Sequence, residues 1–288
     1  MFDLTRIPEI EKTPKRFKLL EHIPFRALDE FPIQLAGTVG DEVLLLLVDF
    51  ETTGLDADTC EPIEIGLVQV SYSPSARRIT EVIEIVSQFE QPKKPISDEI
   101  TRITGITNEM VKGHSFDEST IERLFNSSKA VVAHNARFDR SFSDARFKNL
   151  GDHVWGCSVK DVDWYGLGFE SAKLEYLLLK NGYFYEGHRA AIDCLAIVQL
   201  FSLVPDALHC ILEAAQEVKY KVLAKGVSFA DKDAVKDRGY RWDGNKRYWW
   251  TEVDAANFDS EKDFLESLCK SSADKNVFML IDKFKRHT

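Results

Sequence analysis

The sequence predicts an α/β fold, with a mixed sheet flanked by helices and a small C-terminal α/β domain. The apolar run at 43–50 is typical of a strand buried on both faces. Two further strand patterns follow at 61–70 and 79–86, and short strands then alternate with helices between 130 and 203. Strands followed by alternating strands and helices indicate a mixed sheet with helical cover. A second strand–helix–hairpin pattern begins after Pro205 and predicts the additional domain.

The first three strands are expected to pair as an antiparallel meander, because only short turn-like segments separate them. Ser97 and Gly105 bracket a short helix as its N-cap and its end. The other elements expected before Pro205 are helix 116–126, strand 130–133, helix 136–148, strand 154–158, helix 174–180 and helix 189–203. Those expected after it are helix 207–217, strand 219–226, helix 231–238, a hairpin over 240–253 and helix 260–270.

Composition and charge limit the classes of protein that the chain can represent. With 44% hydrophobic and 29% charged residues, the chain has the profile of a soluble globular protein. The net charge of −10 argues against a protein that coats nucleic acid, but is compatible with an enzyme whose bound cations attract it. The N-terminal segment lacks the apolar region of a secretory signal, and the run at 43–48 is too short to span a membrane.

The five cysteines are scattered and contain no C-x-x-C pair, which is typical of reduced thiols. We therefore expect a cytoplasmic location and no membrane partner. The expected organisation is an N-terminal arm at 1–42 with a short helix near 15–22, a main domain at 43–210 and an accessory domain at 218–288.

Asp49 and Glu51 place two carboxylates at the end of the first buried strand. Residues two apart on a strand point to the same side, so both side chains aim at one spot. Two like charges in a partly dry site repel each other and lose hydration, which a bound cation would offset. The alternative is an acidic strand end that is merely solvated, and the pair alone does not decide between them.

A second acidic position follows the strand at 130–133. His134 ends this strand, Asn135 can cap the next helix, and Asp139 lies one turn into that helix, facing back toward the strand end. Because a sheet places the ends of neighbouring strands side by side, Asp139 can join the first two carboxylates. Taken by itself, Asp139 is more typical of a solvated first-turn acid near the positive end of a helix than of a functional residue.

His188 and Asp193 form the third position. Five residues along one helix are about 140° apart around its axis, so the two side chains meet only if His188 lies in a loop and Asp193 begins the helix at 189–203. That helix is otherwise rich in Ala, Ile and Leu, where an unpaired acid is costly. A lone histidine is more often an ordinary surface or core residue, but the loop position and the other acids favour a functional one here.

Four carboxylates and one loop histidine suit the hydrolysis of a phosphodiester. The cofactors expected are Mg²⁺ or Mn²⁺, two per site, because these ions take hard oxygen ligands. Two cations about 4 Å apart can activate water and stabilise both the attacking and the leaving oxygen. A histidine with an ordinary pKa of about 6.5 can accept the proton of the water at neutral pH.

The motif order D-x-E, H-N-x-x-F-D and H-x-x-x-x-D resembles that of the DEDDh (DnaQ-like) family. This family comprises 3′–5′ exonucleases of ribonuclease H-like fold and includes the proofreading epsilon subunit of bacterial DNA polymerase III. The stretch at 100–110 is similar to the family pattern I-x-x-x-T-G-I-T-x-x-M. The resemblance covers 44–203 and implies a ribonuclease H-like exonuclease domain. The tyrosine variant of the family would need a tyrosine where Arg189 and Ala190 stand, which favours the histidine class.

The resemblance implies a role for each matching residue. Asp49 would bridge two metal ions, and Glu51 and Asp193 would hold the ion that activates water. Asp139 would hold the second ion, and His188 would be the general base. The residues implied in gripping the terminal nucleotide or in lining its pocket are Thr52, Thr53, Gly54, Leu55, His134, Asn135 and Phe138.

The activity implied is a metal-dependent 3′–5′ exonuclease, a hydrolase that releases nucleoside 5′-monophosphates from single-stranded DNA in repair or proofreading. One alternative is an exoribonuclease or oligonucleotidase, because the motifs do not separate DNA from RNA. Another is a non-catalytic scaffold that binds nucleic acid, although the intact set of site residues argues against it.

Basic and aromatic residues interleave between 219 and 250, where nine Lys or Arg and seven aromatic residues face four acids. This pattern is typical of a groove that stacks single-stranded nucleic acid. It is also typical of a small domain that uses its tryptophans as core. Both interpretations stay open at the level of the sequence.

Overall fold

The computed structural model describes residues 4–25, 30–268 and 276–288. The chain forms two compact units, the first made of Met1–Leu212 with His287–Thr288 and the second of Glu213–Arg286. The sequence places the corresponding change between 210 and 218.

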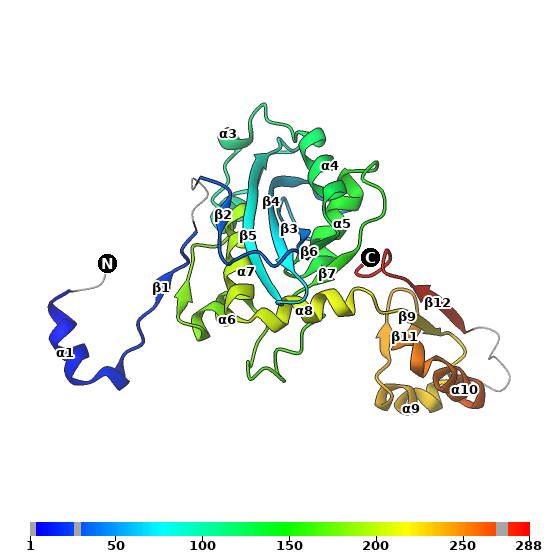
Figure 1. The fold of residues 1–288 in the computed structure, drawn as a ribbon. Helices are drawn as coiled ribbons and strands as arrows, with labels where there is room; N and C mark the ends of the chain where they lie inside the picture. Colours follow the sequence, from blue (N-terminus) through cyan, green and yellow to red (C-terminus); the bar gives the residue numbers. More distant parts are fainter. Residues whose placement is uncertain (1–3, 26–29, 269–275) are drawn as a thin grey trace. The chain divides into compact units, whose positions relative to one another are not determined.

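The first unit is built on a six-stranded sheet of order β2-β5-β4-β3-β6-β7 (Figure 1). Strands β3, β4 and β5 form the predicted antiparallel meander, while β6 and β7 run parallel to β3. The sheet is therefore mixed, as predicted. The strands are β2 (Ile33–Gln34), β3 (Val43–Thr52), β4 (Pro62–Ser73), β5 (Arg78–Phe89), β6 (Ala130–Ala133) and β7 (Trp155–Cys157).

The helices of the first unit agree with the sequence to within a few residues. Ser97 Oγ accepts the amide of Ile100, and Gly105 ends the following helix in the left-handed conformation, as predicted. Pro205, predicted to end one helix, also begins the next, where its fixed φ suits a first position. The helices are α2 (Asp98–Thr104), α3 (Asn108–Val111), α4 (Glu118–Ser127), α5 (Ala136–Arg146), α6 (Leu174–Lys180), α7 (Ala190–Leu203) and α8 (Pro205–Ala214).

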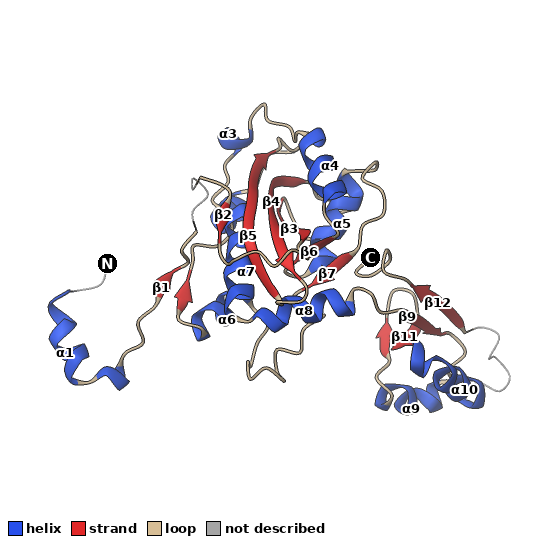
Figure 2. Cartoon of the chain, in the orientation of Figure 1, coloured by secondary structure: helices blue, strands red, loops and turns tan. Residues whose placement is uncertain are grey.

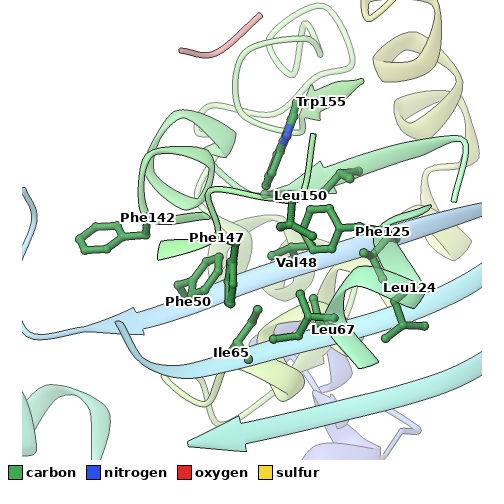
Figure 3. Close-up of a cluster of buried hydrophobic side chains, with 14 of the residues drawn as sticks. Val48, Phe50, Ile65, Leu67, Leu124, Phe125, Phe142, Phe147, Leu150 and Trp155 are labelled. Atoms are coloured by element: carbon green, nitrogen blue, oxygen red, sulfur yellow. The ribbon is translucent and has the colours of Figure 1, made fainter. Parts of the chain in front are cut away.

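Helices cover both faces of this sheet (Figure 2). On one face, Val48 and Phe50 of β3 point toward Phe125, Phe147 and Trp155 in a buried apolar cluster under α4 and α5 (Figure 3). Because strand side chains alternate, the residues between them, Asp49 and Glu51 included, belong to the face that α7 covers. The central strand thus carries an apolar side and a side that ends in carboxylates.

The N-terminal segment differs from its prediction. The expected helix near 15–22 is absent from the described residues there; instead α1 spans Ile7–Lys12, with Pro8 in its first turn. Residues Glu21–His22 form β1, which pairs in parallel with β8 (Tyr183–Phe184). The pairing partner lies some 160 residues along the chain, so local patterns could not reveal it.

The second unit has a four-stranded sheet of order β10-β11-β9-β12. The hairpin predicted around Asp243-Gly244 is confirmed, because β10 and β11 pair antiparallel across it. Strand β12 was not predicted, and the last two residues of the predicted helix 260–270 lie outside the described residues. The elements are β9 (Lys219–Ala224), α9 (Lys232–Asp237), β10 (Arg241–Asp243), β11 (Tyr248–Asp254), α10 (Phe258–Leu268) and β12 (Val277–Ile281).

Within the described part of the chain, no single helix is long and apolar enough to cross a membrane. Helices α7 and α8 meet the length and hydropathy requirement only as a pair, with a bend of 104° between them. The cytoplasmic location stays a prediction.

Candidate active site

Three carboxylates meet at the end of β3. Oxygen atoms of Asp49, Glu51 and Asp193 all lie within 4.8 Å of one another. Asp49 and Glu51 come from one strand, two positions apart, and the pairing of β3 with β4 becomes irregular directly after Glu51. Asp49 and Glu51 therefore lie at the end of β3, and Asp193 approaches them from α7.

Gly66 explains how Asp193 comes so close. In the sheet, Gly66 of β4 stands directly opposite Asp49, and a Cβ added to it would lie 2.2 Å from the carbonyl carbon of Ala190. The first turn of α7 thus rests on the bare backbone of β4. A glycine inside an apolar strand is a recognised sign of close backbone approach. Here it lets α7, and with it Asp193, lie close to the sheet.

Asp139 completes the acidic group from the other side of the strand end. Its carboxylate is buried, with 1% of the residue exposed, and its Oδ1 accepts the amide hydrogen of Phe50 at 3.1 Å. Negative charge on Asp139 is also the largest electrostatic cause that raises the pKa of Asp49. The structure therefore brings all four predicted carboxylates together.

Asn135 precedes α5 as expected, but its side chain does not cap the helix. It adopts a left-handed conformation, with φ of 79°, which asparagine tolerates better than most residues. The prediction of a side-chain cap was wrong. Asn135 instead provides the left-handed backbone conformation of the sharp turn from β6 into α5.

Burial and mutual repulsion make this a poor place for four free negative charges. Burial, followed by repulsion from Asp193 and Glu64, raises the pKa of Glu51 to about 8, while the charge of Arg189 opposes this rise. Burial followed by the neighbouring carboxylates likewise raises the pKa of Asp49 well above its ordinary value. Asp139 and Asp193 are shifted in the same direction, with burial as the main cause. Such a site takes up either protons or hard cations, and carboxylate oxygens fit Mg²⁺ or Mn²⁺.

His188 lies in the loop before α7, as predicted, and its side chain is exposed. It has a φ of 68°, a conformation that is uncommon for histidine. Its charge lowers the pKa of Asp193, which places the imidazole close to the carboxylate cluster. The next residue, Arg189, donates its amide hydrogen to Asp193 Oδ2 at 3.1 Å and so ties the histidine loop to the cluster.

Sequence reasoning missed a buried ion pair that supports this loop. Glu64 is fully buried and stands opposite Glu51 in the sheet. Its two carboxylate oxygens accept three hydrogen bonds from the Arg189 guanidinium, at 3.0–3.2 Å, and Ser87 Oγ donates a further one. An acid in an otherwise apolar strand was the available signal, since a buried acid requires a partner.

Tyr185 was missed as well. Its hydroxyl donates to Asp193 Oδ1 at 3.0 Å, so both oxygens of Asp193 have a hydrogen-bond donor. Burial, followed by the charge of Asp193, raises the pKa of Tyr185 and keeps this donor protonated. A tyrosine three residues before His188 carries no motif, so nothing in the sequence marks it.

The residues expected to grip a nucleotide form the loop that leaves β3. Thr53 pairs with Glu61 through its amide and its hydroxyl, which closes the loop, and Leu55 is 88% exposed at its tip. Thr52 Oγ1 donates to the carbonyl of Gly54. A cleft of about 720 Å³ is lined by Thr53, Lys93 and Lys94, among other residues.

His134 and Phe138 flank the start of α5. A nitrogen of His134 lies 2.6 Å from Ser158 Oγ, and burial lowers the pKa of this histidine to about 4, so it is neutral at physiological pH. Phe138 packs against Phe142, with ring centroids 4.9 Å apart.

Comparison with known proteins identifies the family. The model of the exonuclease family RNase_T matches residues 46–201. The chain belongs to this exonuclease family. The resemblance to DnaQ-like 3′–5′ exonucleases inferred from the motifs is confirmed, and so is the mixed sheet flanked by helices.

Relatives similar in sequence to this chain include PolC-type DNA polymerases III. The chain is 30% identical to that of Caldanaerobacter subterraneus subsp. tengcongensis over 187 residues, which cover 62% of this chain and 12% of the relative. It is 34% identical to that of Thermotoga maritima over 146 residues, 50% of this chain and 9% of the relative. The chain thus spans about a tenth of the length of the curated relatives it matches.

Solved structures with a similar fold include other exonucleases. Exonuclease X in complex with 5′-overhanging duplex DNA is 26% identical, with a TM-score of 0.43 over 57% of this chain and 90% of the other. The nuclease domain of the DEDDh family member 3′hExo, bound to rAMP, is 17% identical, with a TM-score of 0.45 over 59% of this chain and 94% of the other.

Proposed function

We propose that this member of the exonuclease family removes nucleoside 5′-monophosphates, one at a time, from the 3′ end of single-stranded DNA. The observation that carries the proposal is the cluster of Asp49, Glu51 and Asp193, whose oxygens lie within 4.8 Å of one another. The basic groups that lower pKa values in this cluster are His188 and Arg189, and Arg189 is already paired with Glu64. Full ionisation of the cluster therefore calls for added cations.

Asp49, Glu51, Asp139 and Asp193 would hold the divalent ions, Mg²⁺ or Mn²⁺, which we propose to be two per site. Ions held there would polarise the phosphodiester and lower the pKa of the attacking water. Asp193 is well suited to its part, because Tyr185 and the Arg189 amide fix both of its oxygens. Fixed ligands keep the reacting atoms in line without reorganisation during the reaction.

His188 acts as the general base in this proposal. Its exposed position in a loop lets the imidazole reach a water molecule beside the cluster. The charge of His188 contributes to lowering the pKa of Asp193, which is consistent with an imidazole close to the carboxylates. The pair formed by Glu64 and Arg189 holds the loop at the right distance.

Substrate binding is proposed for the loop at 52–55 and the adjoining cleft. The exposed side chain of Leu55 can pack on the terminal base, while the backbone beside Thr52 can bind the 3′ hydroxyl. Lys94 and Lys93, which line the same cleft, offer positive charge to phosphates further along the strand, although Lys93 also pairs with Glu61 at 3.4 Å. The DNA polymerase III relatives favour DNA, and an RNA or short-oligonucleotide substrate is the alternative.

The test follows 5′-labelled single-stranded DNA and RNA of the same sequence in the presence of Mg²⁺, Mn²⁺ or EDTA. We expect a ladder that shortens from the 3′ end with either metal, no reaction in EDTA, and DNA as the faster substrate. His188→Ala should lower the rate by roughly a hundredfold or more, in line with the loss of a general base. His114→Ala, an exposed histidine in another loop of the same unit, is the matched control and should keep the wild-type rate.

Intact substrate under every metal condition would contradict catalysis and leave a nucleic-acid-binding scaffold. Faster digestion of RNA would change the substrate. Titration with Mn²⁺ tests the number of ions, because two should bind to the wild-type chain and Asp49→Ala should lose them. A single site in the wild-type protein would contradict the two-metal mechanism.

A further inference from the structure

The sheet of the second unit has one face packed on helices. Val222 and Ala224 of β9 form a buried apolar cluster with Val235 of α9 and Leu265 of α10, and Trp249 of β11 packs against it. This accounts for one of the three tryptophans in the unit as core. Because side chains alternate along a strand, the neighbours of these residues lie on the opposite face.

That opposite face carries the basic and aromatic residues that the core does not use. Arg241 of β10 stands directly opposite Trp250 of β11 in the sheet, and Lys221, Lys225 and Tyr248 share their side. We call Lys221, Lys225, Arg241, Tyr248 and Trp250 the basic-aromatic face.

Cations surround the two aromatic rings of this face. Lys221 Nζ lies 5.1 Å and Arg241 Cζ 5.6 Å from the centroid of the Trp250 ring. Lys225 Nζ lies 5.6 Å from the centroid of Tyr248. Within the part of the chain that the structure describes, no ion pair engages any of these three cations. Three acids of β10 and β11 share the face. Asp243 is turned toward the hairpin, where it accepts the amides of Asn245 and Lys246. Glu252 and Asp254 stand opposite Lys221 and Lys219 of β9 in the sheet.

We propose that the basic-aromatic face binds single-stranded nucleic acid, with bases stacked on Trp250 and Tyr248 and phosphates on Lys221, Lys225 and Arg241. Planar rings bordered by the exposed Lys225 and Arg241 and the partly buried Lys221 match a polymer that alternates planar bases with phosphates. An acidic peptide would match the cations but leave the rings without a partner. This inference goes beyond the proposed exonuclease activity, since it concerns binding that needs neither metal nor catalysis.

Spacing supports a single strand rather than a duplex. Tyr248 and Trp250 are two positions apart on β11, which corresponds to about 6.7 Å along the strand. Bases in a stacked strand are about 3.4 Å apart. The two rings therefore suit bases that have been drawn apart, each with a ring beneath it, and a duplex cannot open in this way without losing its own stacking.

The experiment measures binding of a fluorescein-labelled 20-nucleotide oligo(dT) to the full chain in EDTA, by fluorescence anisotropy over a range of salt concentrations. Trp250→Ala should raise Kd about tenfold, since stacking on one aromatic ring contributes roughly that factor or more. Trp250→Phe keeps a ring and should recover most of the affinity. Trp242→Ala removes the half-exposed tryptophan of the same hairpin that lies on the other side of β10, and should change Kd by less than twofold.

A charge variant keeps the proposal testable if Trp250→Ala fails to fold. Lys225→Ala combined with Arg241→Ala changes two exposed residues and should raise Kd about tenfold. It should also lower the slope of log Kd against log salt by about 1.4, because each phosphate of a single strand that the protein neutralises contributes about 0.7 to that slope. Lys236→Ala, an exposed lysine of α9, is the matched control and should leave the slope within experimental error.

Three results would overturn the proposal. The first is a wild-type Kd in both the Trp250→Ala and the double variant, and the second is a loss of affinity in the Trp242→Ala and Lys236→Ala controls equal to that in the test variants. The third is displacement of the oligonucleotide as readily by polyglutamate or duplex DNA as by unlabelled oligo(dT). Failure of the exonuclease assay would leave these measurements unaffected, because they are made without metal.

Discussion

The carboxylate cluster of the first unit and the basic-aromatic face of the second unit differ in how their charges meet solvent. Asp49, Glu51 and Asp193 are partly buried, and their pKa values are raised by burial and by one another. On the face of the second unit, Lys225 and Arg241 are exposed beside aromatic rings. Buried charges of one sign impose a cost that a bound ion relieves, whereas exposed charges impose little and simply attract a polyanion.

Asp49→Asn should have the largest effect on the carboxylate cluster while leaving the basic-aromatic face unchanged. It removes a ligand that no neighbour replaces, so we expect the rate of DNA hydrolysis to fall on the order of a thousandfold. The same change removes a buried, repelled charge, so the metal-free protein should melt at a higher temperature than the wild type. Rate assays with Mn²⁺ and thermal melts in EDTA measure the two effects.

Asp152→Asn, an exposed aspartate of the same unit, is the control and should change neither quantity. Oligonucleotide binding in EDTA should stay within twofold of the wild type in both variants. If Asp49→Asn lowered the melting temperature of the metal-free protein, the carboxylate would be stabilising rather than repelled, and the electrostatic account of the site would be wrong.

Gly66→Ala should have the next largest effect, through packing alone. Its Cβ would lie 2.2 Å from the Ala190 carbonyl carbon, so α7 must move away from β4 and carry Asp193 with it. Forcing an added methyl group into close-packed backbone costs roughly 3 kcal/mol of folding free energy. The displaced ligand should also lower the rate about a hundredfold.

Gly37→Ala provides the matched control, because a Cβ there meets no atom within 4 Å. Urea unfolding should leave Gly37→Ala within about 0.5 kcal/mol of the wild type, as for most surface substitutions. Equal stabilities for the two variants would show that the approach of α7 to β4 is not tight. The basic-aromatic face should bind oligo(dT) normally in both.

Local patterns were sufficient for most elements around the site. Ser97 and Gly105 marked both ends of α2, and the apolar run before Asp49 marked the central strand. The motif spacings were also sufficient to bring Asp139 and Asp193 to that strand, because strand ends and helix starts converge at one edge of a mixed sheet. The assignment of these residues to catalysis stays a proposal.

Features that depend on partners far away in the chain could not be predicted from the sequence. Glu64 pairs with Arg189, which is 125 residues away in the chain, and β1 pairs with β8. Gly66 could have been recognised, since a lone glycine in a buried strand signals close approach, but what approaches it depends on the tertiary fold. The basic-aromatic pattern was ambiguous for the same reason: only strand register separates Trp249 in the core from Trp250 on the open face.

The smallest effect we expect is a decrease in the free energy of unfolding as the pH rises, which bound metal ions should remove. A carboxyl whose pKa is higher in the folded than in the unfolded protein stabilises the fold while it is protonated. For Glu51 this contribution is complete below about pH 4.5, the ordinary value, and is lost as the pH rises through about 8. In EDTA the free energy of unfolding should therefore decrease by about 2 kcal/mol between pH 5 and pH 8.5, allowing for screening by solvent at the open side of the cluster.

Mn²⁺ should abolish this decrease, because the ions bind the deprotonated carboxylates and stabilise the fold increasingly as the pH rises. A glutamine side chain cannot titrate, so Glu51→Gln should make the EDTA curve less steep and weaken the response to Mn²⁺, while Asp49, Asp139 and Asp193 still titrate. Urea melts at a series of pH values, with and without Mn²⁺, distinguish these cases. A wild-type stability that rose from pH 5 to pH 8.5 in EDTA would mean that the carboxylates are already compensated by the protein, and the charge argument for bound cations would fail.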